Sequence, residues 1–431
     1  MENSLCEKPE RHAPRRLSDY LMLEGQKQKV HSLVDKVYSR KNLKLAWERV
    51  RANRGASGTD GITIGAFEVN LDANLERLHQ ELRNKTYQPQ PVRRLEIPKR
   101  GTPGKTRPLG IPSVYDRVCQ QALVNRLESI FEKVFDPSSF GYRKGRKTAD
   151  ALSKIWREVE AGSEWIVDAD LKDYFGSLVG KQIADSRVLK LIQQMLEAGY
   201  EEKGQRFETP RGTPQGGVIS PLLSNILLTP FDKEMRHQGY RLTRWADDWV
   251  VTCRTRAEAK DALVRAAKIL AKLGVTLNRE KTRIVHIAQG FEFLGFKIQR
   301  GKGQFKLTRD RIKSTLNRRN LYAIPTQKSV DRFKDQIRTW TKRHTPLRMG
   351  GLINTINPII RGWGNYYCRS HVRKRFSQLD RWIIRRLWSH RTKQWRNTGW
   401  REYPTRRLRT EFKLVSLVAL IPSLQIAKAH S

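Results

Sequence analysis

The stretch RWADDWV, residues 244–250, places two adjacent carboxylates, Asp247 and Asp248, between two runs of β-strand character. These runs, YRLTRWA and WVVTCR, predict a hairpin with a tight turn. Acidic turn residues are ordinarily just turn formers. However, a second apolar strand, WIVDADLKDYF, ends in Asp168 and Asp170. If Asp170 lies beside the hairpin tip, the carboxylates repel one another, and divalent cations are needed to neutralise them.

A large basic excess indicates the partner. The chain carries 84 Lys and Arg against 43 Asp and Glu, a net charge of +41 over 431 residues. Such a chain needs a polyanion or screening salt, and nucleic acid is the leading candidate. A ribosome-like or merely soluble basic protein is the alternative, but 38% hydrophobic residues and 11 Trp favour sizeable cores. Widely spaced cysteines predict neither a zinc site nor disulfides, and no apolar run is long enough to span a bilayer. We therefore expect a cytoplasmic protein without a membrane partner.

The chain changes character along its length. Residues 165–300 alternate strand, helix, strand, strand, helix, strand, the order of an α/β domain on a partly antiparallel sheet. Before them, PVRRLEIPK and GTPGKTRPLGIP predict a basic hairpin. The last 131 residues hold 31 Lys and Arg but 6 Asp and Glu, so +25 of the net charge lies there. Apolar residues recur in that segment at helical spacing, namely Phe376, Leu379, Ile383 and Leu387.

Several motifs resemble those of a known family. DADLKDYF, TPQGGVISPLLSNILL, RWADDWV, GVTLNREKT and FEFLGFKI stand in the order and spacing of the palm motifs of reverse transcriptases. From about residue 40 to 400 the chain resembles the reverse transcriptase/maturase proteins encoded by group II introns, including GASGTDGIT, SSFGYRKGRKTADAL and IRGWGNYY. The resemblance implies an α+β right-hand polymerase fold: fingers and a palm with an antiparallel sheet, followed by an α-helical thumb.

The resemblance also implies how the chain divides. The expected segments are a mobile N-terminal extension (1–28), fingers with the N-terminal motifs (29–164), a palm with the catalytic carboxylates (165–300), a helical thumb or maturase RNA-binding domain (301–400), and a basic C-terminal segment (401–431).

The resemblance assigns metal-binding roles to residues of the palm. Asp170 and Asp247 match the metal ligands, Asp248 is a supporting carboxylate, and Leu171 would add a backbone carbonyl. Two Mg²⁺ ions, with Mn²⁺ as a possible substitute, would activate a primer 3′-hydroxyl and stabilise the leaving pyrophosphate.

A second set of residues would bind the incoming dNTP. Lys99 and Arg107 would bind the triphosphate, and Lys281 would lie near the leaving phosphate. Phe175 would stack under the sugar and exclude a 2′-hydroxyl. Gln215 and Gly216 would form the nucleotide-binding turn. Without the resemblance, the basic residues read as a solvated loop, Phe175 as core packing and PQGG as a plain loop.

The late basic segment interleaves aromatic residues with arginine, as expected of a surface that contacts RNA phosphates and bases. The candidate RNA-binding residues are Arg361, Arg373, Arg375, Arg385 and Arg386. Trp363, Tyr366 and Tyr367 have an alternative place in the core of a helical bundle, which we favour for at least one of them.

Two positions depart from the family pattern. Trp245 stands where the family usually has Tyr, which replaces a hydroxyl near the primer terminus with an indole that only donates. Gly176 stands where a polar residue, commonly Asp, often follows the Phe pair. Because the carboxylates remain, we expect activity with altered primer handling or fidelity.

These motifs indicate an RNA-directed DNA polymerase of group II intron type that also binds RNA as a splicing maturase. The expected partners are a structured RNA, which the resemblance implies is group II intron RNA, a primed RNA or DNA template, and dNTPs. The protein is expected to act as a monomer or homodimer. One alternative is a related enzyme freed from its intron and used in DNA repair or phage defence. Another is a non-catalytic RNA-binding maturase. The Cys pairs and His cluster of the family's DNA-binding and endonuclease domains are not found before Ser431, so we expect no target-strand cleavage.

Overall fold

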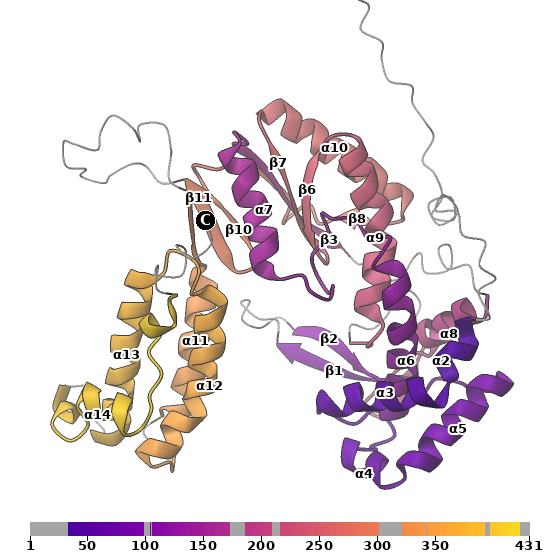
Figure 1. Ribbon diagram of the computed structural model, residues 1–431, viewed down its shortest axis with the longest axis horizontal. Helices are drawn as coiled ribbons and strands as arrows, with labels where there is room; N and C mark the ends of the chain where they lie inside the picture. Colours follow the sequence, from indigo (N-terminus) through magenta and orange to yellow (C-terminus); the bar gives the residue numbers. More distant parts are fainter. Residues whose placement is uncertain are drawn as a thin grey trace, which may run out of the picture. The chain divides into compact units, whose positions relative to one another are not determined.

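The computed structural model describes residues 33–98, 104, 106–172, 186–208, 216–300, 321–342, 344–392 and 397–422. The chain divides into two compact units, Met1–Ile284 and Val285–Ser431 (Figure 1). Within the described residues, no helix is long and apolar enough to cross a membrane. The predicted N-terminal extension, 1–28, lies outside the described residues.

Helices build the first part of the first unit around one hydrophobic core. In α3, Leu43, Trp47 and Val50 recur at helical spacing and are buried. They pack with side chains from the neighbouring helices, among them Leu123 and Ile192. The helices are α2 (Leu33–Tyr38), α3 (Arg40–Ala52), α4 (Ile64–Val69), α5 (Leu71–Asn84), α6 (Val114–Phe131) and α8 (Ser186–Glu197).

The predicted basic hairpin is present and supplies two strands of a four-stranded sheet. Strand β1 (Val92–Pro98) pairs antiparallel with β2 (Thr106–Ile111), and the sheet continues in the order β2-β1-β4-β5. Strands β4 (Tyr200–Glu202) and β5 (Gln205–Phe207) complete it. The sequence prediction had no place for β4 and β5, which are three residues long each.

A second sheet carries the acidic motifs. Its strands follow the order β6-β7-β3-β8, with β9 also paired to β3, and β3 runs antiparallel to β7 and β8. The predicted series of strand, helix, strand, strand, helix, strand is present as β3, α9, β6, β7, α10 and β8, but the prediction was incomplete, because α8, β4 and β5 lie between β3 and α9 and further strands follow β8. The elements are β3 (Trp165–Lys172), α9 (Ser220–His237), β6 (Arg241–Trp245), β7 (Asp248–Cys253), α10 (Arg256–Lys272), β8 (Thr276–Leu277) and β9 (Arg283–His286).

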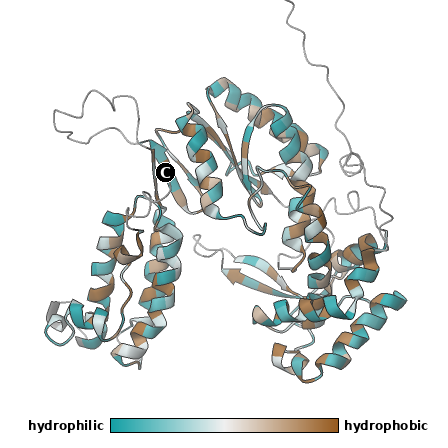
Figure 2. Cartoon of the chain, in the orientation of Figure 1, coloured by the Kyte–Doolittle hydropathy of each residue, from teal (hydrophilic) through white to brown (hydrophobic). Residues whose placement is uncertain are grey.

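Helices cover both faces of this sheet. Alternate residues of β7, Trp249 and Val251, join the core under α9 and α10, together with Phe231. On the opposite face, Thr252 donates from its hydroxyl to Glu158 of α7 (Thr148–Glu160) at 2.8 Å. Figure 2 shows hydrophobic residues along these strands. The sheet is therefore buried along most of its length, and polar residues collect at one end.

The second unit combines a small sheet with helices. Strands β10 (Phe291–Phe293), β11 (Phe296–Arg300) and β12 (Leu321–Pro325) pair in the order β10-β11-β12. The apolar residues predicted at helical spacing are buried on α13. The other elements are α11 (Gln327–Trp340), α12 (Met349–Tyr367), α13 (Arg373–Thr392), η4 (Asn397–Trp400), α14 (Thr405–Thr410) and η5 (Val418–Leu420).

Aromatic packing joins the sheet of the second unit to its helices. Trp363 stacks on Phe333 with ring centroids 4.6 Å apart, and its indole N–H donates to Ser329. Tyr367 is 3% exposed and packs on Phe296. The preference for a bundle core is thus confirmed for Trp363 and Tyr367, whereas Tyr366 is 45% exposed. The compact unit that contains this sheet and its helices begins at Val285.

Candidate active site

The pairing of β3 with β7 brings the predicted carboxylates together at one end of the sheet. Asp170 lies directly opposite Asp248, and Asp248 in turn faces Trp245 across the hairpin. Residues directly opposite one another share a face, and side chains alternate along a strand, so Asp168 lies on the same face as Asp170 and Asp248. Asp247 occupies the turn between β6 and β7. The predicted hairpin is confirmed, and Asp168 adds a further carboxylate.

The hairpin turn has a strained backbone that its neighbours hold in place. Ala246, its first central residue, has φ +59°, which is unfavourable for a side chain with a Cβ. Gly141 packs directly beneath it: a Cβ at this position would lie 2.5 Å from the Ala246 nitrogen. The Gly141 carbonyl accepts a hydrogen bond from the Asn225 amide at 2.8 Å. Helix α9 and the FGYR motif therefore both support the turn.

Arg244, the third residue before Asp247, anchors the hairpin from inside. Its side chain and that of Asp232 on α9 are both 0% exposed, and they form two bonds, Nε–Oδ1 at 2.7 Å and Nη2–Oδ2 at 2.6 Å. The same guanidinium donates to Asn225 Oδ1 at 3.0 Å, to the Ala246 carbonyl at 2.9 Å and to Ser139 Oγ at 2.8 Å. One buried cation thus ties α9, the turn and the preceding loop together.

The carboxylates raise one another's proton affinity. Burial raises the pKa of Asp248 to about 8, with further increases from Asp168, Asp170 and Asp247, against which Lys281 acts weakly. Burial also raises the pKa of Asp247, and the charge of Asp170 adds to this rise. The end of the sheet therefore holds more negative charge than its neighbours neutralise, which favours binding of cations.

This raised pKa predicts how the stability of the metal-free protein depends on pH. Between the ordinary value of 3.8 and about 8, folded Asp248 keeps a proton that the unfolded chain has lost. Stability therefore falls as the pH rises through this window, and the loss is complete above it. In chelator, melting curves between about pH 5 and pH 9 should decline less steeply for Asp248→Asn than for the wild type. Equal slopes, with exposed Asp72→Asn as the control, would contradict this.

Two cations already lie against the acidic cluster. The Lys281 ammonium donates to Asp170, and this bond raises the pKa of Lys281. Arg283 contacts Asp168 with Nη2 3.3 Å from Oδ2. The Lys281 and Arg283 side chains are 54% and 61% exposed, so water screens both pairs and they are readily exchanged for another cation.

The donor set fits a hard divalent metal ion, because Mg²⁺ prefers carboxylate and carbonyl oxygens. As the side chains stand, no three of the His, Cys, Asp and Glu residues in the described ranges converge into a ready-made metal cage. Lys281 takes the position of a counter-ion to Asp170 instead. Leu171 is buried in β3, and the Asp170 carbonyl next to it accepts from the Asn278 nitrogen at 2.9 Å, so this part of the backbone is fixed.

In the basic hairpin, Arg107 of β2 is exposed and lies opposite Ile97 of β1. Burial and the charge of Asp247 raise the pKa of the Tyr142 hydroxyl, whereas the charge of Arg107 lowers it. Arg107 and Asp247 therefore act on the same hydroxyl.

Gly216, in the PQGG motif, packs against β2. Its φ is +138°, and a Cβ would come within 2.1 Å of the Gly110 carbonyl oxygen of β2. Gln120 of α6 accepts from the Val218 nitrogen at 2.7 Å and fixes the following residues. Glycine is required here by the close approach of two backbones. Lys99, Phe175, Gly176 and Gln215 lie outside the described residues.

The candidate RNA-binding arginines belong to the second unit and differ in their contacts. Arg361, Arg373 and Arg385 are exposed, and Arg375 is half-buried. The half-buried Arg386 donates to the Thr341 carbonyl at 2.7 Å and to its hydroxyl at 3.0 Å. This bond to the end of α11 favours a packing role for Arg386, while the other arginines stay predictions.

Sequence reasoning missed the residues that hold the site. It noted Asp168 only as weak evidence, and it did not consider Arg244, Asp232 or Tyr142. One signal was present: Arg244 lies in YRLTRWA with Leu242 and Ala246 two positions to either side, and a buried arginine needs a buried acid. The sequence does not show which acid pairs with it.

Comparisons with known proteins agree with this geometry. Residues 97–298 match the reverse transcriptase (RNA-dependent DNA polymerase) family, and residues 330–408 match the group II intron maturase-specific domain. The group II intron-encoded protein LtrA of Lactococcus lactis subsp. cremoris is 30% identical over 425 residues, which cover 78% of this chain and 69% of LtrA. Protein YkfC of Escherichia coli K12 is 32% identical over 296 residues, 58% of this chain and 77% of YkfC.

A chain of the partial Cas6-RT-Cas1–Cas2 complex is 22% identical with a TM-score of 0.35, over 57% of this chain and 43% of that chain, too low to bear on function. The mixed α/β unit with antiparallel sheets and a carboxylate-bearing hairpin is that of a reverse transcriptase, an RNA-directed DNA polymerase. The chain belongs to the family of group II intron-encoded reverse transcriptase/maturase proteins.

Proposed function

We propose that the acidic end of the β3–β7 pair is where a primer 3′-hydroxyl attacks an incoming dNTP. Asp170 and Asp247 would hold two Mg²⁺ ions, with Asp248 beside them and the Leu171 carbonyl as a further ligand; Mn²⁺ is a possible substitute. Bound ions would stabilise the attacking and leaving oxygens of an in-line displacement. The observation that carries this proposal is the direct pairing of Asp170 with Asp248 beside the Asp247 turn.

The chain's own residues prepare this site. Asp247 is held at the turn by the Arg244 bond to Ala246. Lys281 contacts Asp170; with Asp170 holding a metal ion instead, the Lys281 ammonium would contact the leaving phosphate. Pre-positioned charges of this kind act without reorganisation during the reaction.

The dNTP would be gripped from the finger side. Arg107 suits bidentate contact with phosphate, and its effect on Tyr142 supports a position near Asp247. Gly216 lets its turn approach β2 closely. With them we propose Lys99 as a second phosphate contact, Phe175 as the sugar gate and Gln215 in the base-binding turn.

We assign the fingers to 29–164, the palm to 165–300, the RNA-binding thumb to 301–400 and the basic segment to 401–431. Structured RNA, as the family implies, would bind the exposed Arg361, Arg373 and Arg385, with Arg375 beside them, and the protein would act in the cytoplasm. Each phosphate contact releases counterions, so this binding should weaken with salt.

Trp245 favours a second candidate, an enzyme of the same chemistry adapted to DNA repair or defence, because it departs from the tyrosine of the mobile-intron enzymes.

Removal of divalent metal tests the proposal. We expect the purified protein to extend a primer on an RNA template with Mg²⁺, to stop in excess chelator and to recover when Mg²⁺ is restored. A filter-binding assay should show that the RNA stays bound in chelator, because the arginines need no metal. Extension that continues after chelation, or that never occurs with either Mg²⁺ or Mn²⁺, would refute the proposed mechanism.

A further inference from the structure

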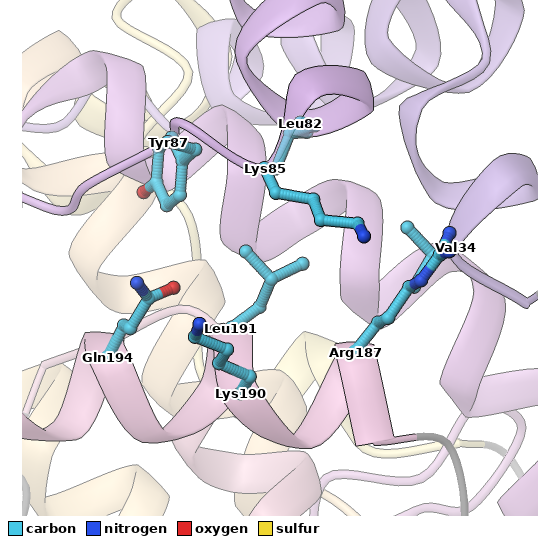
Figure 3. Close-up of a pocket in the computed structure, with 8 residues that line it drawn as sticks. All are labelled: Val34, Leu82, Lys85, Tyr87, Arg187, Lys190, Leu191 and Gln194. Carbon is cyan, nitrogen blue, oxygen red and sulfur yellow. The ribbon is translucent and has the colours of Figure 1, made fainter.

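An exposed tyrosine, Tyr142, has a backbone conformation that tyrosine rarely adopts. Its φ is +56°, and 61% of the residue is exposed. Bulky side chains are uncommon in this left-handed region, which glycine enters freely. At other such positions the cause is local: Lys85 caps the end of α5 beside the pocket drawn in Figure 3, and Lys203 forms the two-residue β4–β5 turn with Gly204. Tyr142 lies between α6 and α7, at the end of neither helix.

The chain before Tyr142 is fixed to the outer edge of β6. Two backbone hydrogen bonds, each 2.9 Å long, join residues 138–140 to Arg244. Because β6 is the last strand of its sheet, this segment pairs with an edge that no strand of the sheet covers. Gly141 then packs beneath Ala246, which sets Tyr142 beside the turn of the catalytic hairpin.

The chain after Tyr142 is fixed as firmly. Arg143 is 8% exposed, and its guanidinium donates to the carbonyl groups of Asp136 and Ser139 at 2.7 and 2.8 Å. It also forms a salt bridge with Glu132, with Nη2 2.6 Å from Oε1. Tyr142 is therefore held on both sides while its own side chain stays exposed. Strain that the surrounding structure maintains next to a reaction site indicates a function for the strained residue.

The order of the strands indicates which substrate Tyr142 faces. The sheet runs β6-β7-β3-β8, and Tyr142 follows the segment paired with the outer edge of β6. Lys281, whose ammonium is proposed to contact the leaving phosphate, follows β8 on the other side of the carboxylates. In an in-line displacement the attacking and leaving oxygens lie on opposite sides of the transferred phosphorus. The β6 side of the turn is therefore the side of the primer 3′-hydroxyl.

A tyrosine side chain suits the sugar and base of a nucleotide, whereas arginine and lysine suit its phosphate. Burial and the charge of Asp247 raise the pKa of the Tyr142 hydroxyl, which agrees with a position beside the turn. The hydroxyl therefore keeps its proton at neutral pH and can donate. The minor-groove edge of a Watson–Crick pair presents acceptors to such a donor, among them adenine N3 and thymine O2.

We propose that Tyr142 binds the last base pair of the primer–template duplex. Its ring contacts the sugar of the primer's terminal nucleotide, and its hydroxyl donates to the minor-groove edge of that pair. This contact positions the primer 3′-hydroxyl for attack. The inference rests on the proposed site at Asp170 and Asp247 and adds a substrate contact to it.

Glycine substitutions at two strained positions separate a substrate contact from a structural role. Tyr142→Gly and Lys203→Gly each place glycine where φ is positive, so both proteins should melt near the wild-type temperature. Lys203 is exposed in the β4–β5 turn and is the control. At saturating dNTP, we expect Tyr142→Gly alone to extend a primed RNA template at least about 10-fold more slowly, because the 3′-hydroxyl is no longer aligned. Wild-type extension would overturn the proposal, and so would a higher KM for dNTP with unchanged kcat, which would place Tyr142 on the dNTP.

A base analogue tests the hydroxyl contact itself. 3-Deazaadenine lacks the N3 acceptor of adenine and is placed in the last base pair, either on the primer or on the template. We expect Tyr142→Phe and one of these two placements each to slow extension about 3- to 10-fold, the scale of one neutral hydrogen bond. Their combination should slow extension no further, because both changes remove the same bond. Effects that multiply for both placements would overturn the proposal.

Binding without chemistry distinguishes a failure of this inference from a failure of the proposed site. The primer carries 2-aminopurine as its terminal base, and no dNTP is added. Its fluorescence in the complex should differ between the wild type and Tyr142→Gly, while Lys203→Gly matches the wild type. Equal fluorescence in all three complexes would overturn the contact with Tyr142. The expected difference together with a wild type that extends no primer would count against the proposed site alone.

Discussion

Replacing Asp247 with alanine should abolish DNA synthesis while the protein stays folded and bound to RNA. Asp247 lies in the turn, its carboxylate is half-buried, and its pKa is raised by burial and by Asp170. Its removal deletes a proposed metal ligand and relieves repulsion, so stability should not fall. We expect extension to drop by at least about 100-fold, the scale seen when one preorganised electrostatic contact is lost.

The measurement is primer extension with Mg²⁺ on a primed RNA template, beside filter binding of the same RNA. Asp247→Asn keeps the side-chain shape and should be nearly as inactive, because the amide carries no charge. Asp72→Ala, on the exposed surface of α5, is the control and should retain full activity. If Asp247→Ala still extended the primer, the metal assignment would be wrong. If both the variant and the wild type failed to extend it but bound RNA, the non-catalytic maturase would be the better account.

Breaking the Arg244–Asp232 pair should have the largest effect on folding. Arg244→Met leaves the Asp232 carboxylate buried and unpaired, which should cost about 3–5 kcal/mol of stability. The double variant Arg244→Met/Asp232→Leu removes both charges and should recover most of this loss, because apolar residues often replace a buried pair without penalty. Urea unfolding of the wild type and both variants measures these differences.

The same double variant separates stability from positioning. It still lacks the bonds from Arg244 to the Ala246 carbonyl and Ser139. We therefore expect a stable protein with lower kcat and a higher Mg²⁺ requirement, since the turn that carries Asp247 is no longer held. Wild-type kcat and Mg²⁺ dependence in the stable double variant would show that the pair serves folding alone. Arg244→Lys should fall between these cases, because a lysine keeps the charge but cannot form all the bonds.

The carboxylate site could largely be predicted because its signals are local. Strand alternation placed Asp168 and Asp170 at the end of an apolar strand, and the short hairpin placed Asp247 and Asp248 at its tip. The order of five motifs then indicated the reverse transcriptase family, which the match over residues 97–298 confirms. The assignments of Lys99, Phe175 and Gln215 stay predictions, since these residues lie outside the described ranges.

Contacts between distant segments were not predictable in the same way. Asn225 and Ser139, 19 and 105 residues from Arg244, both bond its guanidinium, and hydrophobic periodicity carries no information about such partners. Arg386 looked like the neighbouring arginines until its bond to Thr341 placed it in the bundle. Tyr142 likewise comes beside the catalytic turn only through the packing of Gly141 on Ala246.

The sequence by itself determined the chemistry of this protein: which carboxylates line the site, which strands carry them, and the basic charge that requires a polyanion. Those properties depend on residue type and on spacings within one or two elements. The tertiary structure alone decided what holds the carboxylates in place, where the second unit begins and which tyrosine lies beside the catalytic turn. These depend on packing between elements far apart in the chain, where many pairings satisfy the same local pattern and only the complete fold selects one.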